Sequence, residues 1–105
     1  LSGYEDAVNE TARLTDERIE LNEYARDALN DAMRRIQFSL QKGEHPFLEV
    51  TYFVPDERKA GGRYEIVSGM IRKLDVGIGY LFLMDGQKIR IQDIFSVKLI
   101  DTKES

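Results

Sequence analysis

The hydrophobic pattern of this 105-residue chain changes its period at Gly43-Glu44-His45-Pro46. Before that point, apolar residues recur at steps of three and four, which is the spacing of one helix face. After it, β-branched and aromatic residues follow the two-residue period of strands. The chain therefore divides into a helical segment, residues 1–43, and a β-rich segment, residues 44–105. At this length we expect the two segments to form one domain around a single core.

The helical segment is predicted to hold a short helix over residues 3–13 and a long amphipathic helix over residues 16–42. Thr15 is the expected N-cap of the long helix, and Gly43 marks its expected end. The apolar residues of the long helix share one face: Leu21, Ala25, Ala28, Leu29, Ala32, Met33, Ile36 and Leu40.

The long helix would measure about 40 Å at 1.5 Å per residue. A compact unit made from the β-rich segment is only about 27 Å across, so it cannot cover the whole apolar face. Either the helix breaks near Leu21-Asn22, or the short helix folds back over the overhang, or another chain covers it. The last arrangement predicts a protein interface, with a second copy or another partner, formed by Leu21, Ala25, Leu29, Met33 and Ile36.

Five short strands are predicted in the β-rich segment, at residues 47–54, 64–74, 78–84, 88–91 and 96–100. Asp85-Gly86 is the strongest hairpin signal, and Gly69 in the second strand indicates a bend or bulge. Closely spaced antiparallel strands with a kinked second strand predict a small SH3-like or Sm-like β-barrel. The expected fold class is α+β, with N-terminal helices followed by this five-stranded barrel.

The composition excludes several kinds of chemistry. The chain has no cysteine and a single histidine, His45, which rules out disulfides, thiolate metal sites and a histidine relay. The serines lack the G-x-S-x-G turn of a nucleophile, and Gly77-Ile78-Gly79 lacks the rest of a phosphate-binding loop. We therefore expect no enzymatic activity, no cofactor and no metal. No apolar run reaches the roughly 20 residues of a membrane span, so the expectation is a cytoplasmic protein without membrane contact.

A local basic patch is compatible with the acidic net charge of −4, because residues 44–105 carry nine basic and ten acidic side chains. Small barrels bind single strands by combining a basic rim with exposed aromatic rings. Arg72 and Lys73 lie late in the second strand, and the nearby aromatic residues are Tyr52, Phe53, Tyr64 and Tyr80. The alternative places the aromatic rings in the core and the charges on a solvated face. The first interpretation predicts a weak nucleic-acid site on Arg58, Lys59, Arg63, Lys88 and Arg90.

Several short patterns, in this order and spacing, resemble the YolD-like family of small proteins from Gram-positive bacteria and their phages. Residues 14–17 lead into Leu21-Asn22 and a long helix, as in that family. The matching patterns that follow are Val50-x-Tyr52-Phe53, Ser68-Gly69-x-Ile71-x-x-Leu74-Asp75, Leu81-x-Leu83 and Lys88-Ile89-x-Ile91-x-Asp93-Ile94-x-x-Val97. The hairpin over residues 54–63 is longer than the family's usual turn. The chain also begins at Leu1-Ser2-Gly3-Tyr4 rather than with the family's short basic segment.

The resemblance implies an accessory role rather than catalysis. YolD-like proteins are often encoded beside error-prone Y-family DNA polymerases and are thought to assist them in the DNA-damage (SOS) response. The expected partner is therefore such a polymerase, a second copy of this chain, or both. A weaker likeness to the Sm-like barrels of WYL-type regulators implies the alternative, a nucleic-acid-binding barrel or regulator.

Overall fold

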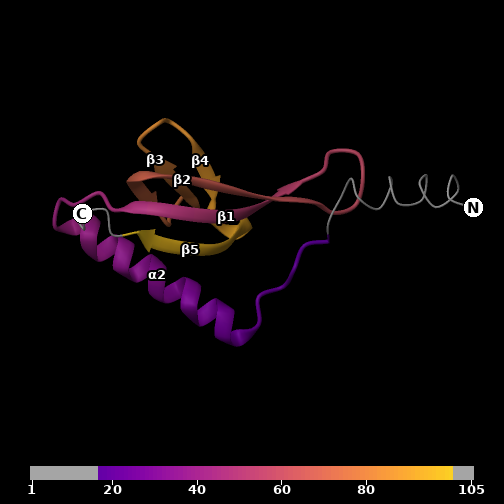
Figure 1. Ribbon diagram of the computed structural model, residues 1–105, viewed down its shortest axis with the longest axis horizontal. Coiled ribbons are helices and arrows are strands. Elements are labelled where there is room, and N and C mark those ends of the chain that lie inside the picture. The colour runs from indigo at the N-terminus through magenta and orange to yellow at the C-terminus, as the bar shows by residue number, and fades with distance from the viewer. Residues whose placement is uncertain (1–16, 101–105) are drawn as a thin grey trace, which may run out of the picture.

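A computed structural model describes residues 17–100 and shows an α+β fold in which one α-helix packs against a five-stranded antiparallel sheet (Figure 1). The strand order across the sheet is β4-β3-β2-β1-β5. The elements run in the order α2 (Glu23–Gln41), β1 (Phe47–Pro55), β2 (Gly62–Asp75), β3 (Tyr80–Leu83), β4 (Lys88–Arg90), the 3-10 helix η1 (Ile91–Asp93) and β5 (Ile94–Ile100). The short helix predicted over residues 3–13 and the predicted N-cap Thr15 lie outside the described residues.

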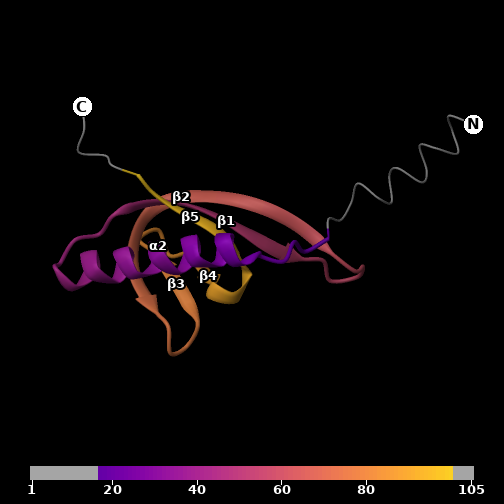
Figure 2. The same cartoon turned by 90° about the horizontal axis from the view of Figure 1, so that it is seen from below.

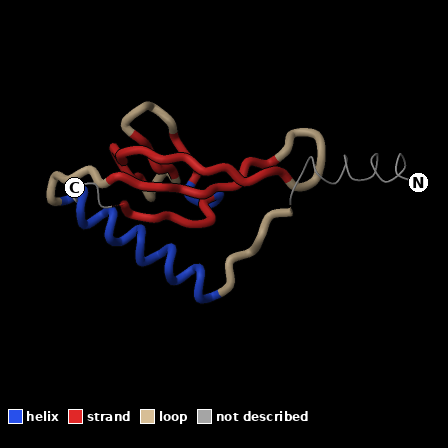
Figure 3. Tube along the Cα trace, viewed as in Figure 1, coloured by secondary structure: helices blue, strands red, loops and turns tan. Residues whose placement is uncertain are grey.

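Helix α2 begins at Glu23, later than the predicted start at residue 16, because Asn22 caps it. The side-chain Oδ1 of Asn22 accepts the backbone N–H of Ala25 at 2.7 Å, and this satisfies one of the donors left free at a helix start. Residues 17–22 have no regular structure and lead from the side of the β1–β2 hairpin to the start of α2 (Figure 3). Of the three arrangements considered for the long helix, the break near Leu21-Asn22 is the one confirmed.

In Figure 2 strand β2 bows into an arch with α2 in front of it, and the apolar face of the helix joins the core that the curved sheet surrounds. Ala32 and Ile36 are buried there, and Leu29, Met33 and Leu40 pack against the same core. The strands contribute one or two inward side chains each: Leu48, Val50, Ile71, Leu81, Leu83, Ile89 and Ile94. The helix therefore completes the core of its own chain.

Strand β2 belongs to both halves of the sheet. Its first part pairs with β1 as far as Met70, and its last part pairs with β3 from Ile71 onward. At Ile71 the linker after the helix also contributes, because Ile71 donates its N–H to the Pro46 carbonyl at 3.0 Å. His45 Nδ1 lies 2.9 Å from the Ile71 carbonyl oxygen. The linker thus satisfies the backbone of β2 at the residue where the strand changes partner.

Register shifts set which side chains face the core. The predicted bulge is not at Gly69, which pairs regularly with Leu48; the pairing of β2 with β3 instead shifts further along the strand, between Ile71 and Lys73. A second shift, between Thr51 and Tyr52 in the pairing of β1 with β5, accompanies a break in the alternation of β1. Each shift inserts an extra residue and bends the strand locally, which curves the sheet.

The predicted strands are confirmed, with boundaries that move by at most two residues. The Asp85-Gly86 hairpin is present between β3 and β4, with Gly86 at a φ of 96°. At the β1–β2 hairpin, Gly62 is buried, and an added Cβ would collide with the carbonyl oxygen of Val54. A glycine is therefore required at that close approach.

Replacing Ile36 tests whether α2 belongs to the core. Its side chain is fully buried, so Ile36→Ala should leave a cavity and lower the free energy of unfolding by about 2–5 kcal/mol in urea titrations. Phe38 on the same helix is 62% exposed, and Phe38→Ala should cost less than about 1 kcal/mol. Equal losses for the two variants would contradict the helix packing described here.

Candidate functional site

Two aromatic rings project from β3 on the outer side of the sheet. Leu81 and Leu83 point into the core, so the alternation of the strand turns Tyr80 and Phe82 the other way. Both rings are partly exposed, and their centroids lie 6.1 Å apart with the ring planes inclined by 37°. The two rings form a short aromatic row on this face.

Cationic side chains from both neighbouring strands surround this row. Directly paired residues of antiparallel strands share a face, which places Lys73 opposite Phe82, with Lys88 on its other side, and Arg90 opposite Tyr80. The register shift after Ile71 leaves Arg72 outside the ladder and turns it to the same side. We name this surface the basic–aromatic face; it consists of Arg72, Lys73, Tyr80, Phe82, Lys88 and Arg90.

Three of the cations lie over the aromatic rings. The guanidinium carbon of Arg72 is 5.2 Å from the centroid of Phe82, and the Lys73 Nζ is 5.9 Å from it. The Nζ of Lys88 is 5.0 Å from the centroid of Tyr80. Contacts of this kind hold a cation near the ring without neutralising its charge, so the face keeps its positive potential.

Two carboxylates adjoin the basic–aromatic face. Asp75 Oδ2 lies 3.4 Å from the Lys73 Nζ, and Asp93 Oδ2 lies 3.9 Å from Arg90 Nε. The pKa of Asp75 is lowered chiefly because its carboxylate accepts the backbone N–H of Ile78 at 3.1 Å, and secondarily by Lys73. Asp75 therefore serves first to close the β2–β3 turn. Arg72 and Lys88 have no ion-pair partner among the residues that the structure describes, and they are the cations most available to an anionic ligand.

The structure divides the predicted nucleic-acid residues into two groups. Lys88 and Arg90 belong to the basic–aromatic face, whereas Arg58, Lys59 and Arg63 lie at the β1–β2 hairpin. Arg63 pairs with Val54, which lines one pocket with Lys88 and Arg90, whereas Arg72 and Lys73 lie about ten residues further along β2. Of the predicted set, only Lys88 and Arg90 flank the aromatic row.

The hairpin group is also weaker electrostatically. Arg63 Nε lies 2.6 Å from Glu65 Oε2, and this ion pair lowers the pKa of Glu65. Lys59 is exposed in a turn where Asp56 accepts its backbone N–H. Of the aromatic residues named from the sequence, Tyr64 packs between Phe53 and Phe95 and does not contact the rings of Tyr80 and Phe82. Phe82 was not among the residues predicted from the sequence, although its alternation with Leu81 and Leu83 indicates that its ring points outward.

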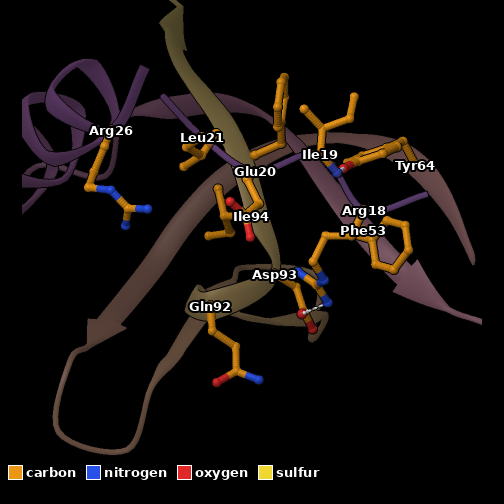
Figure 4. Close-up of a pocket in the computed structure, with 11 residues that line it drawn as sticks. Arg18, Ile19, Glu20, Leu21, Arg26, Phe53, Tyr64, Gln92, Asp93 and Ile94 are labelled. Carbon is orange, nitrogen blue, oxygen red and sulfur yellow. Dashed lines mark hydrogen bonds and ion pairs between the residues drawn. The ribbon is translucent and has the colours of Figure 1, made fainter. Parts of the chain in front are cut away.

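A second cluster fixes the extended segment 17–22 to the sheet (Figure 4). Arg18 donates from Nη2 to Asp93 Oδ1 at 2.7 Å, and its guanidinium lies 4.5 Å from the centroid of Phe53. The backbone N–H of Ile19 donates to the Tyr64 hydroxyl at 2.7 Å. Asp93 is the one charged residue in the described part of the chain that is buried, with 8% of its surface exposed. The chain's own Arg18 therefore fills this site, which acts as a tether for the segment.

The predicted protein interface is mostly covered by the chain itself. Ile36 is fully buried, and Leu29 and Met33 pack against the core with only part of their surface exposed. Leu21 and Ala25 remain partly exposed. A shallow pocket between the first half of α2 and β5 is lined by Tyr24, Ala25, Ala28, Leu29, Phe95, Ser96 and Val97.

No group of three or more His, Asp or Glu side chains in residues 17–100 is arranged to hold a metal ion. Within the same residues, no helix is long and apolar enough to cross a membrane. Comparison with models of known protein families, with curated proteins and with solved structures finds no match for this chain. The likeness to the YolD-like family therefore stays a prediction from the sequence patterns alone.

Removing the tether should loosen the segment before α2. Arg18→Ala deletes the ion pair to Asp93 and the contact with Phe53, and should lower the free energy of unfolding by about 1 kcal/mol, because Arg18 is partly solvated. Hydrogen exchange at the Ile19 amide should accelerate. Arg26→Ala is the control, since Arg26 has no ion pair within residues 17–100. The same exchange rate in both variants would show that Arg18 does not hold the segment.

Proposed function

We propose that this protein is a non-enzymatic module that binds nucleic acid on its basic–aromatic face. The observation that carries the proposal is the gathering of Arg72, Lys73, Lys88 and Arg90 around two outward rings of an otherwise acidic chain. Phosphate groups account for most of the affinity of such surfaces, and aromatic rings add contacts with bases. The proposal corresponds to the alternative considered from the sequence, now centred on a different set of residues.

We further propose that the curved sheet is a small barrel of the SH3-like or Sm-like type. Its strand order, the 3-10 helix before β5 and the long shared strand β2 support this assignment. One pocket is lined by residues 52–55 of β1 and by residues 88–90 of β4, although these strands are not neighbours in the sheet. The sheet thus curls far enough to bring its β4 edge near β1.

The binding proposal is tested by two matched double variants that each remove two positive charges. Arg72→Ala with Lys88→Ala should weaken the binding of an oligonucleotide at low salt about tenfold or more. It should also make the slope of log K against log salt shallower by about 1.4 for a single strand. Arg58→Ala with Lys59→Ala removes the same charge from the β1–β2 hairpin and should change the affinity much less.

Fluorescence anisotropy in a salt series measures both quantities, and circular dichroism checks that the variants are folded. If the two double variants lose the same affinity for the oligonucleotide, then either the site lies elsewhere or binding depends only on the net charge of the protein. Absence of binding by the unaltered protein at the lowest salt concentration would refute the proposal.

A second candidate function is that of an accessory protein of a Y-family DNA polymerase in the DNA-damage response. It is supported by the likeness to the YolD-like family and by the shallow pocket between α2 and β5. Tyr24 stands beside this pocket with 84% of its surface exposed, as an aromatic anchor for a protein partner would. Ala25 and Leu29, two residues of the predicted interface, line the same pocket.

Co-purification with a Y-family polymerase from DNA-damaged cells tests this candidate. Ala28→Glu places a charge in the exposed pocket and should abolish co-purification, whereas Arg34→Glu, elsewhere on the solvated side of α2, should not. Circular dichroism should show both variants folded. Docking at the pocket between α2 and β5 would be contradicted if both variants still co-purify with the polymerase, or if neither does.

A further inference from the structure

We infer that the ligand of the basic–aromatic face is a single strand whose unpaired bases stack on Tyr80 and Phe82. This inference rests on the proposed nucleic-acid binding and specifies its ligand. In a duplex, the faces of the bases are stacked against one another and offer only their edges to a protein. Ring faces become available when bases are unpaired, which is why aromatic rings mark surfaces for single strands.

The dimensions of the face suit two neighbouring nucleotides. The centroids of Tyr80 and Phe82 are 6.1 Å apart, a separation that one extended step of a flexible strand can span. The cations lie on β2 to one side of the rings and on β4 to the other, and adjacent strands are about 4.8 Å apart. A strand that runs along β3 therefore meets Lys73 and Lys88 on the two sides of Phe82, and Arg90 on the β4 side of Tyr80, where Asp75 lies on the β2 side.

The cations over the rings do not prevent stacking. A cation–π contact at an exposed site corresponds to about two- to fivefold in an equilibrium constant. A base stacked on an aromatic ring corresponds to about 5- to 150-fold. A base is therefore favoured over the cation on the ring, and the long side chains of Arg72 and Lys88 can turn to the phosphates of the bound strand. Each of these cations would lose its contact with a ring and gain a contact with a phosphate.

The inference separates two contributions that different ligands can test. Tyr80→Leu with Phe82→Leu removes both rings while keeping apolar side chains on β3. This variant should bind an eight-residue thymidine oligonucleotide about 10- to 100-fold more weakly than the unaltered protein. An abasic deoxyribose-phosphate strand of the same length keeps the phosphates without bases, and its affinity should be the same for both proteins.

Further arms define the ligand class and guard against a folding defect. A duplex of the same sequence should bind the unaltered protein more weakly than the thymidine strand, and a uridine strand shows whether ribose is accepted equally. Phe82→Tyr keeps a ring and should retain the affinity for thymidine strands. Thermal unfolding of the leucine variant by circular dichroism shows whether it is folded.

Two results would overturn the inference: equal affinity of the unaltered protein for abasic and thymidine strands, or unchanged thymidine binding by the folded leucine variant. In either case the charge variant Arg72→Ala with Lys88→Ala keeps the broader proposal testable. If that variant still weakens the binding of both strands, the face binds phosphates without stacking. If it weakens neither, the proposed function fails together with the inference.

Discussion

The sharing of β2 between two pairing partners is the constraint on which the rest of the fold depends. A strand of 14 residues is too long to remain flat over so small a core, and it leaves β1 at Met70 to continue with β3. At that point Ile71 must point inward to fill the core, and its backbone is satisfied by the linker residues His45 and Pro46. The bend, the core and the connection to α2 therefore meet at one residue.

The same register shift creates the candidate site. In an undisturbed strand, the two residues after Ile71 would lie on opposite faces. The extra residue lets Arg72 and Lys73 both reach the ring of Phe82 on the outer side. Two adjacent cations on one face would repel each other, and the negative surface of the ring beneath them offsets part of that repulsion. A feature that first serves to curve the sheet thus also gathers positive charge.

Much of the fold follows from local signals in the sequence. The change of period at Gly43, the Asp85-Gly86 turn and the capping side chain of Asn22 each act within a few residues, so they can be recognised without the tertiary structure. The helix is also no longer than the β-rich unit allows, because the 19 residues of α2 measure about 28 Å, close to the width of the unit that it covers. A longer helix would have left apolar surface in water.

The site was less predictable, because it depends on contacts between distant residues. Arg63 and Lys88 both carry a positive charge in the sequence. In the fold, Arg63 forms an ion pair with Glu65, whereas Lys88 lies over the ring of Tyr80. The docking of Arg18 on Asp93 joins residues 75 positions apart, and no local pattern announces it. Likewise, a register shift at Ile71 depends on how β3 packs, so the pairing of Arg72 with Phe82 could not be read from the order of residues.

The arrangement of the sheet bears on whether the two candidate functions exclude each other. The basic–aromatic face is built on β2, β3 and β4, whereas the pocket beside Tyr24 lies between α2 and β5. The residues that line the pocket between α2 and β5 include none of the residues of the basic–aromatic face. Asp93 lies between these regions and contacts both Arg90 and Arg18, which links the basic face to the segment that leads into α2. The two proposed functions therefore rest on different side chains, and a variant of one surface leaves the side chains of the other unchanged.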